Sequence, residues 1–268
     1  MSNSIAGKTA IVTGAANGVG LAVARHFVAE GANVVFADMD EKQLCKEVEE
    51  DAKSSERVLK FAGDLRQKLA IANLLSATID AFERVDILVN ASRQVLTTDP
   101  LDPDDTSVEE MLEQNLMTSL RMSRAVAKRM IRQADGQDED GPVGAIVNIS
   151  SIAARRTHPA LMGYSVSCAA LDQMTRSMAV AFAAQRIRVN AVAFGSVMSA
   201  SLKGSLKADE DMREAILENT PLHRIASPAE VSDAVQFLAS DASAFVTGQI
   251  ITVDGGRTLI DPAAVSAH

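Results

Sequence analysis

A single tyrosine, Tyr164, lies 13 residues after Ser151 in a chain of 268 residues, where a helix is expected to begin. A phenol held beside a serine hydroxyl can exchange a proton with the oxygen of an alcohol or a ketone, which is general acid–base chemistry. One helical turn further, on the same face of that helix, lies Cys168. A thiol, with an ordinary pKa of about 8.5, is a poor substitute for a cation that would lower the pKa of a neighbouring phenol. The pattern predicts an acid–base site with altered chemistry.

A glycine-rich segment, TGAANGVG at residues 13–20, follows the first expected strand and opens the first expected helix. Gly14, Gly18 and Gly20 allow the backbone to turn tightly and to approach a pyrophosphate, while the N-terminus of the helix supplies N–H donors. Strand, turn and helix occur in the order that a dinucleotide-binding loop requires. The segment therefore predicts a nucleotide site, the alternative being a turn that only packs the helix on the strand.

An acidic residue, Asp38, ends the second expected strand. A carboxylate at that place can hold the ribose hydroxyls of adenosine and would repel a 2′-phosphate. Met39 follows it, where an arginine or a lysine could have received such a phosphate, and Asn17 in the glycine segment is neutral. These residues favour NAD over NADP as the cofactor.

Short runs rich in β-branched residues alternate with amphipathic helical patterns along the chain, without a repeat or a domain linker. Strands that alternate with helices indicate parallel βαβ units, and strands without a polar face indicate a sheet that is covered on both sides. We therefore expect one α/β domain over residues 1–268. The expected strands are 9–13, 33–38, 57–62, 85–90, 145–150, 188–193 and 249–254, and the long expected helices are 19–30, 67–84, 108–133, 160–185 and 228–240.

The bulk composition argues against several classes of function. The formal net charge of −9 and the isoelectric point near 5.0 disfavour nucleic acid or an anionic membrane surface as a partner. The two cysteines, Cys45 and Cys168, have no metal-ligand spacing, so we expect no metal site, and their scarcity fits a reducing cytoplasm. We find neither the apolar core of a signal peptide nor an apolar run long enough to span a bilayer, so we expect no membrane association.

Several motifs, taken in order, make the chain resemble the short-chain dehydrogenase/reductase family nearly from end to end. The glycine segment matches the family's TGxxxGxG motif, DILVN (86–90) its fourth strand, and IVNISS (146–151) the strand that carries its catalytic serine. Further matches are GDL (63–65), QNL (114–116), RVNAVAFG (188–195) and FVTGQIITVDGG (245–256). Linked motifs in the right order are far more specific than a glycine segment alone.

The resemblance implies a single Rossmann-type domain, a doubly wound sheet of seven parallel strands with helices on both faces. It implies an oxidoreductase for a secondary alcohol or its ketone, in which Tyr164 is the acid/base, Ser151 binds the substrate oxygen and Asn115 supports the site. In the family, a lysine four residues after the tyrosine binds the nicotinamide ribose and lowers the pKa of the tyrosine. The residues that the resemblance places in the NAD pocket are Gly14, Asn17, Gly18, Val19, Gly20, Asp38, Asp64, Leu65, Asn90 and Val197.

The resemblance also bears on substrate and assembly. Residues 200–230 are similar to both bacterial hydroxysteroid dehydrogenases and 3-oxoacyl-carrier-protein reductases, and a segment at about 196–220 is expected to cover a small apolar alcohol or ketone. Two long helices pair across subunits in family members, which implies a homotetramer. Five methionines on those helices fit either core packing or a subunit contact: Met117, Met122, Met130, Met174 and Met178.

Three departures from the family pattern put the chemistry in question. The family's NNAG is Asn90-Ala91-Ser92-Arg93 here, the proline of its PG pair is Phe194, and the lysine is Cys168, which is also open to interpretation as a small buried residue. Arg93 either supplies the missing charge at the carboxyl edge of the sheet or points to water. An inward Arg93 would favour an enzyme. An outward one would favour a cofactor-binding pseudoenzyme that stabilises or regulates a partner subunit.

Overall fold

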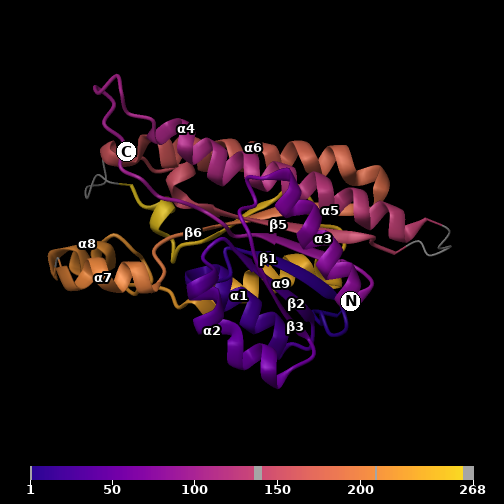
Figure 1. The fold of residues 1–268 in the computed structure, drawn as a ribbon. Helices are drawn as coiled ribbons and strands as arrows, with labels where there is room; N and C mark the ends of the chain where they lie inside the picture. Colours follow the sequence, from indigo (N-terminus) through magenta and orange to yellow (C-terminus); the bar gives the residue numbers. More distant parts are fainter. Residues whose placement is uncertain (1, 136–140, 209, 262–268) are drawn as a thin grey trace.

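Seven parallel strands form one sheet in the computed structural model, which describes residues 2–135, 141–208 and 210–261 (Figure 1). The strand order is β3-β2-β1-β4-β5-β6-β7, so the direction of winding reverses between β1 and β4. Ligands of such sheets bind at the carboxyl ends of the strands beside this reversal. The strands are β1 (Thr9–Thr13), β2 (Asn33–Asp38), β3 (Val58–Ala62), β4 (Ile87–Asn90), β5 (Gly144–Ser151), β6 (Ile187–Phe194) and β7 (Ile250–Val253).

Helices cover both faces of the sheet and divide the core into two layers. One layer packs α1 (Gly18–Ala29), α2 (Glu41–Ser54) and α9 (Pro228–Ala239) on the strands. The other packs α3 (Lys68–Phe82), α5 (Thr118–Ala134) and α6 (Met162–Phe182). Neighbouring residues of one strand serve opposite layers, as a period of two requires. The expected doubly wound α/β fold with seven parallel strands is confirmed.

The expected strands all form, and the main difference lies in the helix expected over residues 108–133. It is divided into α4 (Ser107–Met111), a π-helical turn (Leu112–Met117) and α5. The helix α2 was not expected, and its face contributes only Leu44 and Val48 to the buried core. Two further helices that were not expected, α7 (Ala200–Ala208) and α8 (Glu210–Glu218), lie within the segment expected to cover the substrate and extend away from the sheet (Figure 1).

The methionines of α5 and α6 belong mainly to the core of the subunit. Met122 and Met130 are completely buried, and Met178 is 6% exposed, all within one chain. A side chain that is enclosed in this way cannot contact a second subunit. For these three residues the core interpretation is therefore correct.

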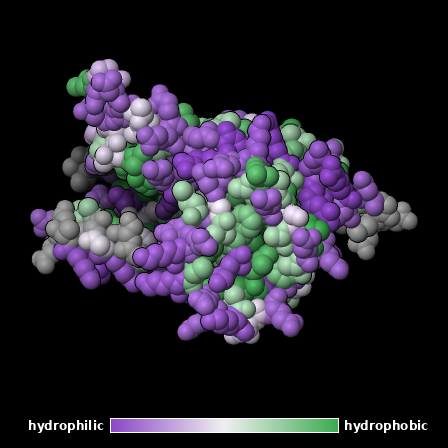
Figure 2. Space-filling model, in the orientation of Figure 1, coloured by the Kyte–Doolittle hydropathy of each residue, from purple (hydrophilic) through white to green (hydrophobic). Residues whose placement is uncertain are grey.

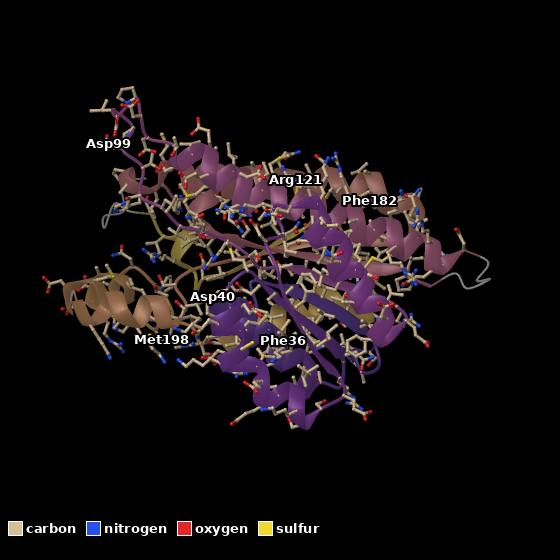
Figure 3. The ribbon with its side chains drawn as sticks, in the orientation of Figure 1. Phe36, Asp40, Asp99, Arg121, Phe182 and Met198 are labelled. Carbon is tan, nitrogen blue, oxygen red and sulfur yellow. The ribbon has the colours of Figure 1, made fainter. Side chains whose placement is uncertain are left out.

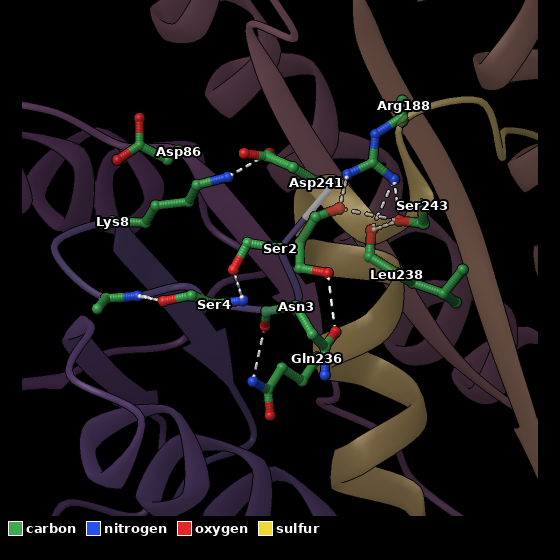
Figure 4. Close-up of polar contacts among 12 residues, drawn as sticks. Ser2, Asn3, Ser4, Lys8, Asp86, Arg188, Gln236, Leu238, Asp241 and Ser243 are labelled. Atoms are coloured by element: carbon green, nitrogen blue, oxygen red, sulfur yellow. Dashed lines mark hydrogen bonds and ion pairs between the residues drawn. The ribbon is translucent and has the colours of Figure 1, made fainter.

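Polar contacts hold β6 and α9 in a fixed relation (Figure 4). Buried Arg188, near the start of β6, donates from Nη1 to the carbonyl oxygen of Leu238 at 2.7 Å and from Nη2 to that of Ser240 at 3.0 Å. Lys8 pairs with Asp241 at 2.7 Å just beyond the end of α9. At the opposite end of β6, Phe194 pairs in register with Ser151 of β5. Within the described residues, none of the helices is both long and apolar enough to cross a bilayer.

Candidate active site

Ser151 and Tyr164 meet where β5 ends and α6 begins. Ser151 Oγ accepts a hydrogen bond from the Ala153 amide at 3.2 Å, which starts a 3-10 turn after the strand. Thr98 accepts a hydrogen bond from the Gly163 amide at 3.1 Å and so fixes the residue before Tyr164. Burial raises the pKa of Tyr164, and a hydrogen bond with the Ser151 side chain opposes part of that rise. The structure therefore brings the expected acid/base and the expected oxygen-binding serine together.

Arg93 points into this site. Its Nη1 donates a hydrogen bond to the Tyr164 hydroxyl at 2.8 Å, and its Cζ lies 4.3 Å from the centroid of the Phe194 ring. A guanidinium on an aromatic face gains a cation–π attraction, which fixes the plane of the fork. Arg93 is an exposed residue, but its guanidinium turns to the Tyr164 hydroxyl, so the interpretation that it only points to water is wrong. Two departures from the family pattern, Arg93 and Phe194, form one unit beside the tyrosine.

The backbone that carries Arg93 is anchored on both sides. Thr13 Oγ1 accepts hydrogen bonds from the Ala91 and Ser92 amides at 3.0 and 3.1 Å. Gly14 lies against the same segment, because a Cβ at that position would be 2.7 Å from the Ala91 oxygen. Gln94, on the other side, exchanges two hydrogen bonds with the Asn115 amide, at 2.7 and 2.9 Å. Arg93 is thus presented to Tyr164 by a segment with little freedom.

Asn115 supports the site through this segment. It lies in the π-helical turn, a rare geometry that is frequent at functional sites. Besides its two bonds to Gln94, its Nδ2 donates to Ser167 Oγ on α6 at 3.1 Å. The side chain therefore ties the Arg93 segment to the helix that carries Tyr164, which is a positioning role.

Burial and charge act on Tyr164 in opposite directions. Its side chain is buried, and burial is the largest influence, so its pKa lies above the usual value near 10. The Arg93 charge and the Ser151 hydroxyl lower that pKa, and Cys168 raises it. Burial also raises the pKa of the Cys168 thiol to about 11, so this residue is neutral at pH 7. Among the described residues, Arg93 is the cation that donates a hydrogen bond to the Tyr164 hydroxyl and lowers its pKa by charge.

Cys168 behaves as a packing residue. It is 4% exposed and lies in a small apolar cluster with Tyr164, Met111 and Ala153. The interpretation of Cys168 as a small buried residue agrees with this environment.

A cavity of about 880 Å³ extends from the glycine segment past Asp38 to Arg93. Its glycine wall is crowded, since a Cβ on Gly20 would lie 2.2 Å from the Gly14 oxygen. Asp38 is held at the cavity by hydrogen bonds that its two carboxylate oxygens accept from the Ala16 and Asp40 amides, each at 3.0 Å. This shape, together with the N-terminus of α1 at Gly18, fits a dinucleotide.

In Figure 2 the surface is hollowed between the arm formed by α7 and α8 and the loop that Figure 3 labels at Asp99. Asp40, which lines the cavity, and Met198, which precedes α7, lie on this side of the molecule (Figure 3).

Most of the residues expected to bind the cofactor line this cavity, namely Gly14, Asn17, Gly18, Val19, Gly20, Asp38, Asp64 and Leu65. Asn90 is buried behind it, where its Nδ2 donates to Ser123 Oγ at 3.0 Å and to Asn148 Oδ1 at 2.8 Å. Val197 is also buried and pairs with Ala226 in an isolated bridge. The cavity is also lined by residues that were not expected at the cofactor: Gln114, which belongs to the QNL motif, and Asp40, Gln43, Arg66, Gln94 and Ser199, which no motif marks.

Comparisons with known proteins agree with this geometry. A family model described as enoyl-(acyl carrier protein) reductase matches residues 14–258. A 3-oxoacyl-[acyl-carrier-protein] reductase of Thermotoga maritima is 32% identical over 256 residues, which are 94% of this chain and 98% of that protein. A cis-4-hydroxycyclohexanecarboxylate dehydrogenase of Sinomonas cyclohexanicum is 34% identical, over 97% of this chain and 100% of that protein.

Solved structures share the whole fold. A 7α-hydroxysteroid dehydrogenase, in complex with NADH and 7-oxo glycochenodeoxycholic acid, superposes with a TM-score of 0.86 at 29% identity, covering 95% of each chain. The fold, the glycine segment, the Ser151–Tyr164 pair and these relatives together assign the chain to the short-chain dehydrogenase/reductase family of oxidoreductases.

Proposed function

We propose that this oxidoreductase is NAD(H)-dependent and interconverts a secondary alcohol and a ketone, with Arg93 as the cation that serves Tyr164. The observation that carries the proposal is the 2.8 Å hydrogen bond from Arg93 to the Tyr164 hydroxyl. A positive charge at that distance favours the phenolate and lowers the pKa of the phenol. The residue that replaces the family's glycine thus takes over the electrostatic part of the missing lysine's role.

The division of roles follows from the positions of the side chains. The nicotinamide cofactor, when bound, supplies or accepts the hydride. Tyr164 gives a proton to the ketone oxygen in reduction and takes the hydroxyl proton in oxidation, while Ser151 donates a hydrogen bond to the same oxygen. Because the pKa of Tyr164 is raised, its phenol is protonated at neutral pH, which suits reduction. Oxidation needs the phenolate, so its rate should rise with pH.

The preference for NAD over NADP is carried by Asp38, whose carboxylate lines the adenosine end of the cavity. We expect NADH to bind at least about tenfold more tightly than NADPH, since a 2′-phosphate there would meet a fixed negative charge. Asp38→Ala should remove most of this difference in calorimetric titrations. Asp51→Ala, on the outer part of α2 and paired with Arg25, is the matched control. Equal affinity of the unaltered protein for both cofactors would contradict the assignment.

We also propose a homotetramer in which α6 forms part of a subunit contact. Three apolar side chains are exposed along this helix: Met162 at 41%, Val166 at 44% and Val180 at 80%. Their spacing of 4 and 14 residues places them on one side of the helix. Sedimentation velocity at micromolar concentration should give about four times the 28.4 kDa mass of the chain. A species of 28.4 kDa alone would refute the assembly.

The function is tested by turnover of NADH with a panel of ketones that includes oxo-steroids and 3-oxoacyl thioesters. These classes are chosen because the relatives include a 3-oxoacyl reductase and a structure that holds a 7-oxo bile acid. We expect measurable reduction that Tyr164→Phe abolishes. Tight cofactor binding without turnover of any ketone or alcohol would instead support the pseudoenzyme.

A further inference from the structure

Arg93 has hydrogen-bond donors that Tyr164 does not use. Nη1 donates to the tyrosine, whereas Nε and Nη2 have no acceptor among the residues that the structure describes. These two nitrogens form the side edge of the guanidinium, whose parallel N–H groups match the two oxygens of a carboxylate. Stacking on Phe194 holds the plane of the fork, so the unused edge has a defined direction.

The charges around the cavity make Arg93 distinct. Five charged side chains line it in the described part of the chain, namely Asp38, Asp40, Asp64, Arg66 and Arg93. Arg66 is neutralised by Asp64, with a salt bridge of 2.8 Å, whereas Arg93 has no carboxylate partner among the described residues. The adenosine end is therefore acidic, and the end near Tyr164 has an available positive charge.

We propose that the substrate is a hydroxy acid or oxo acid whose carboxylate binds the Nε–Nη2 edge of Arg93. This inference rests on the proposed function. The reacting oxygen must come within about 3 Å of the Tyr164 hydroxyl, and Arg93 is 2.8 Å from that hydroxyl. The Nε–Nη2 edge faces away from Nη1, so a carboxylate paired with it lies about 7 Å from the Tyr164 hydroxyl. Its carboxyl carbon is therefore separated from the reacting carbon by two or more carbons, as in 4- and 5-hydroxy acids.

The reaction leaves the carboxylate unchanged. In oxidation the hydroxy acid loses a hydride from its carbinol carbon to the oxidised nicotinamide and loses its hydroxyl proton to Tyr164, which forms the C=O bond. In reduction the oxo acid takes back both. Arg93 contacts the substrate in each direction, so it selects the substrate as well as adjusting the pKa of the tyrosine.

The test compares matched charged and neutral substrates on one enzyme. The probes are 4-hydroxyhexanoate and 5-hydroxyhexanoate, each with its primary amide. Both members of a pair need Tyr164, so the ratio of their kcat/KM values isolates recognition of the carboxylate. We expect the better acid to exceed its amide by about thirtyfold or more, the scale of a charge-assisted hydrogen-bond pair. Arg93→Ala should reduce this ratio to near one, and Arg93→Lys should retain part of it.

A measurement of ligand binding tests the same contact without turnover. In the presence of NADH, hexanoate should bind the unaltered protein more tightly than hexanamide, and Arg93→Ala should remove the difference. Equal kcat/KM values for acid and amide, with turnover intact, would overturn the inference and leave the proposed function standing. The inference would also fail if Arg93→Ala raised only the Kd for NADH and left the acid-to-amide ratio unchanged, since Arg93 would then serve the cofactor's pyrophosphate. Failure of every alcohol and ketone to react would overturn the proposed function as well.

Discussion

Arg93→Ala is expected to lower alcohol oxidation at pH 7 by about tenfold to a hundredfold, the loss of phenolate that a rise of one to two units in the pKa of Tyr164 causes. Burial already raises the pKa of Tyr164, and the Arg93 charge opposes that rise. Without the guanidinium the pKa rises further, and each added unit leaves about tenfold less phenolate at a given pH. The rise of the oxidation rate with pH should therefore move to higher pH. Ketone reduction should fall less, because it uses the protonated phenol.

Two matched variants separate this effect from a general loss of arginine. Arg93→Lys keeps a positive charge but loses the planar fork that stacks on Phe194. Its oxidation rate should therefore lie between those of the unaltered protein and Arg93→Ala. Arg25→Ala removes a surface arginine paired with Asp51, and it should leave the rate unchanged. Oxidation profiles of Arg93→Ala and the unaltered protein that coincide over the whole pH range would show that Arg93 has no electrostatic role.

Cys168→Lys, which restores the family's residue, is expected to have opposite effects in two backgrounds. In the unaltered protein the new ammonium would enter a buried site beside the Arg93 guanidinium, and like charges at close range repel each other. Oxidation should then fall by about tenfold. When Arg93 is glycine, as in the family pattern, the ammonium can approach the Tyr164 hydroxyl without a competing cation, and oxidation should rise.

The double variant Arg93→Gly/Cys168→Lys tests quantitatively whether the two positions depend on each other. If Arg93→Gly costs about a hundredfold and Cys168→Lys about tenfold, independent effects would multiply to about a thousandfold. We expect the double variant to be only about tenfold below the unaltered protein, a coupling of about 3 kcal/mol. Cys168→Ala, which removes the thiol without adding charge, should change oxidation little. Thermal unfolding must accompany each measurement, since overpacking at position 168 can cost about 1–3 kcal/mol. If the losses of the two single variants multiply in the double variant, Arg93 does not replace a lysine at position 168.

Much of the fold could be predicted from local pattern. Three features depend only on residues that are close together in the sequence: the apolar strands, the glycine segment and the acidic end of β2. The structure places all three as expected. The helix α2 was missed because it is mainly polar, with a narrow buried face. The π-helical turn at Asn115 was missed because apolar residues continue at helical spacing through it.

The direction of Arg93 could not be decided from the sequence, because its partners come from distant parts of the chain. Phe194 lies at the end of β6 and Tyr164 at the start of α6, and neither is a neighbour of Arg93 along the chain. The bonds between Asn115 and Gln94 that fix this segment also depend on the folded geometry. Two substitutions that look independent in the sequence, Arg93 and Phe194, therefore form one site with Tyr164 only in three dimensions.

The central claim, that Arg93 lowers the pKa of Tyr164, can be measured directly because this chain has one tyrosine and no tryptophan. The ultraviolet absorbance of the phenolate therefore reports Tyr164 alone. The unaltered protein and Arg93→Ala would be titrated to alkaline pH, with circular dichroism at each point to establish that the protein is folded. We predict that Tyr164 in Arg93→Ala ionises about one to two pH units higher than in the unaltered protein, with Arg93→Lys between them. Superimposed curves, or a lower midpoint in Arg93→Ala, would contradict the claim.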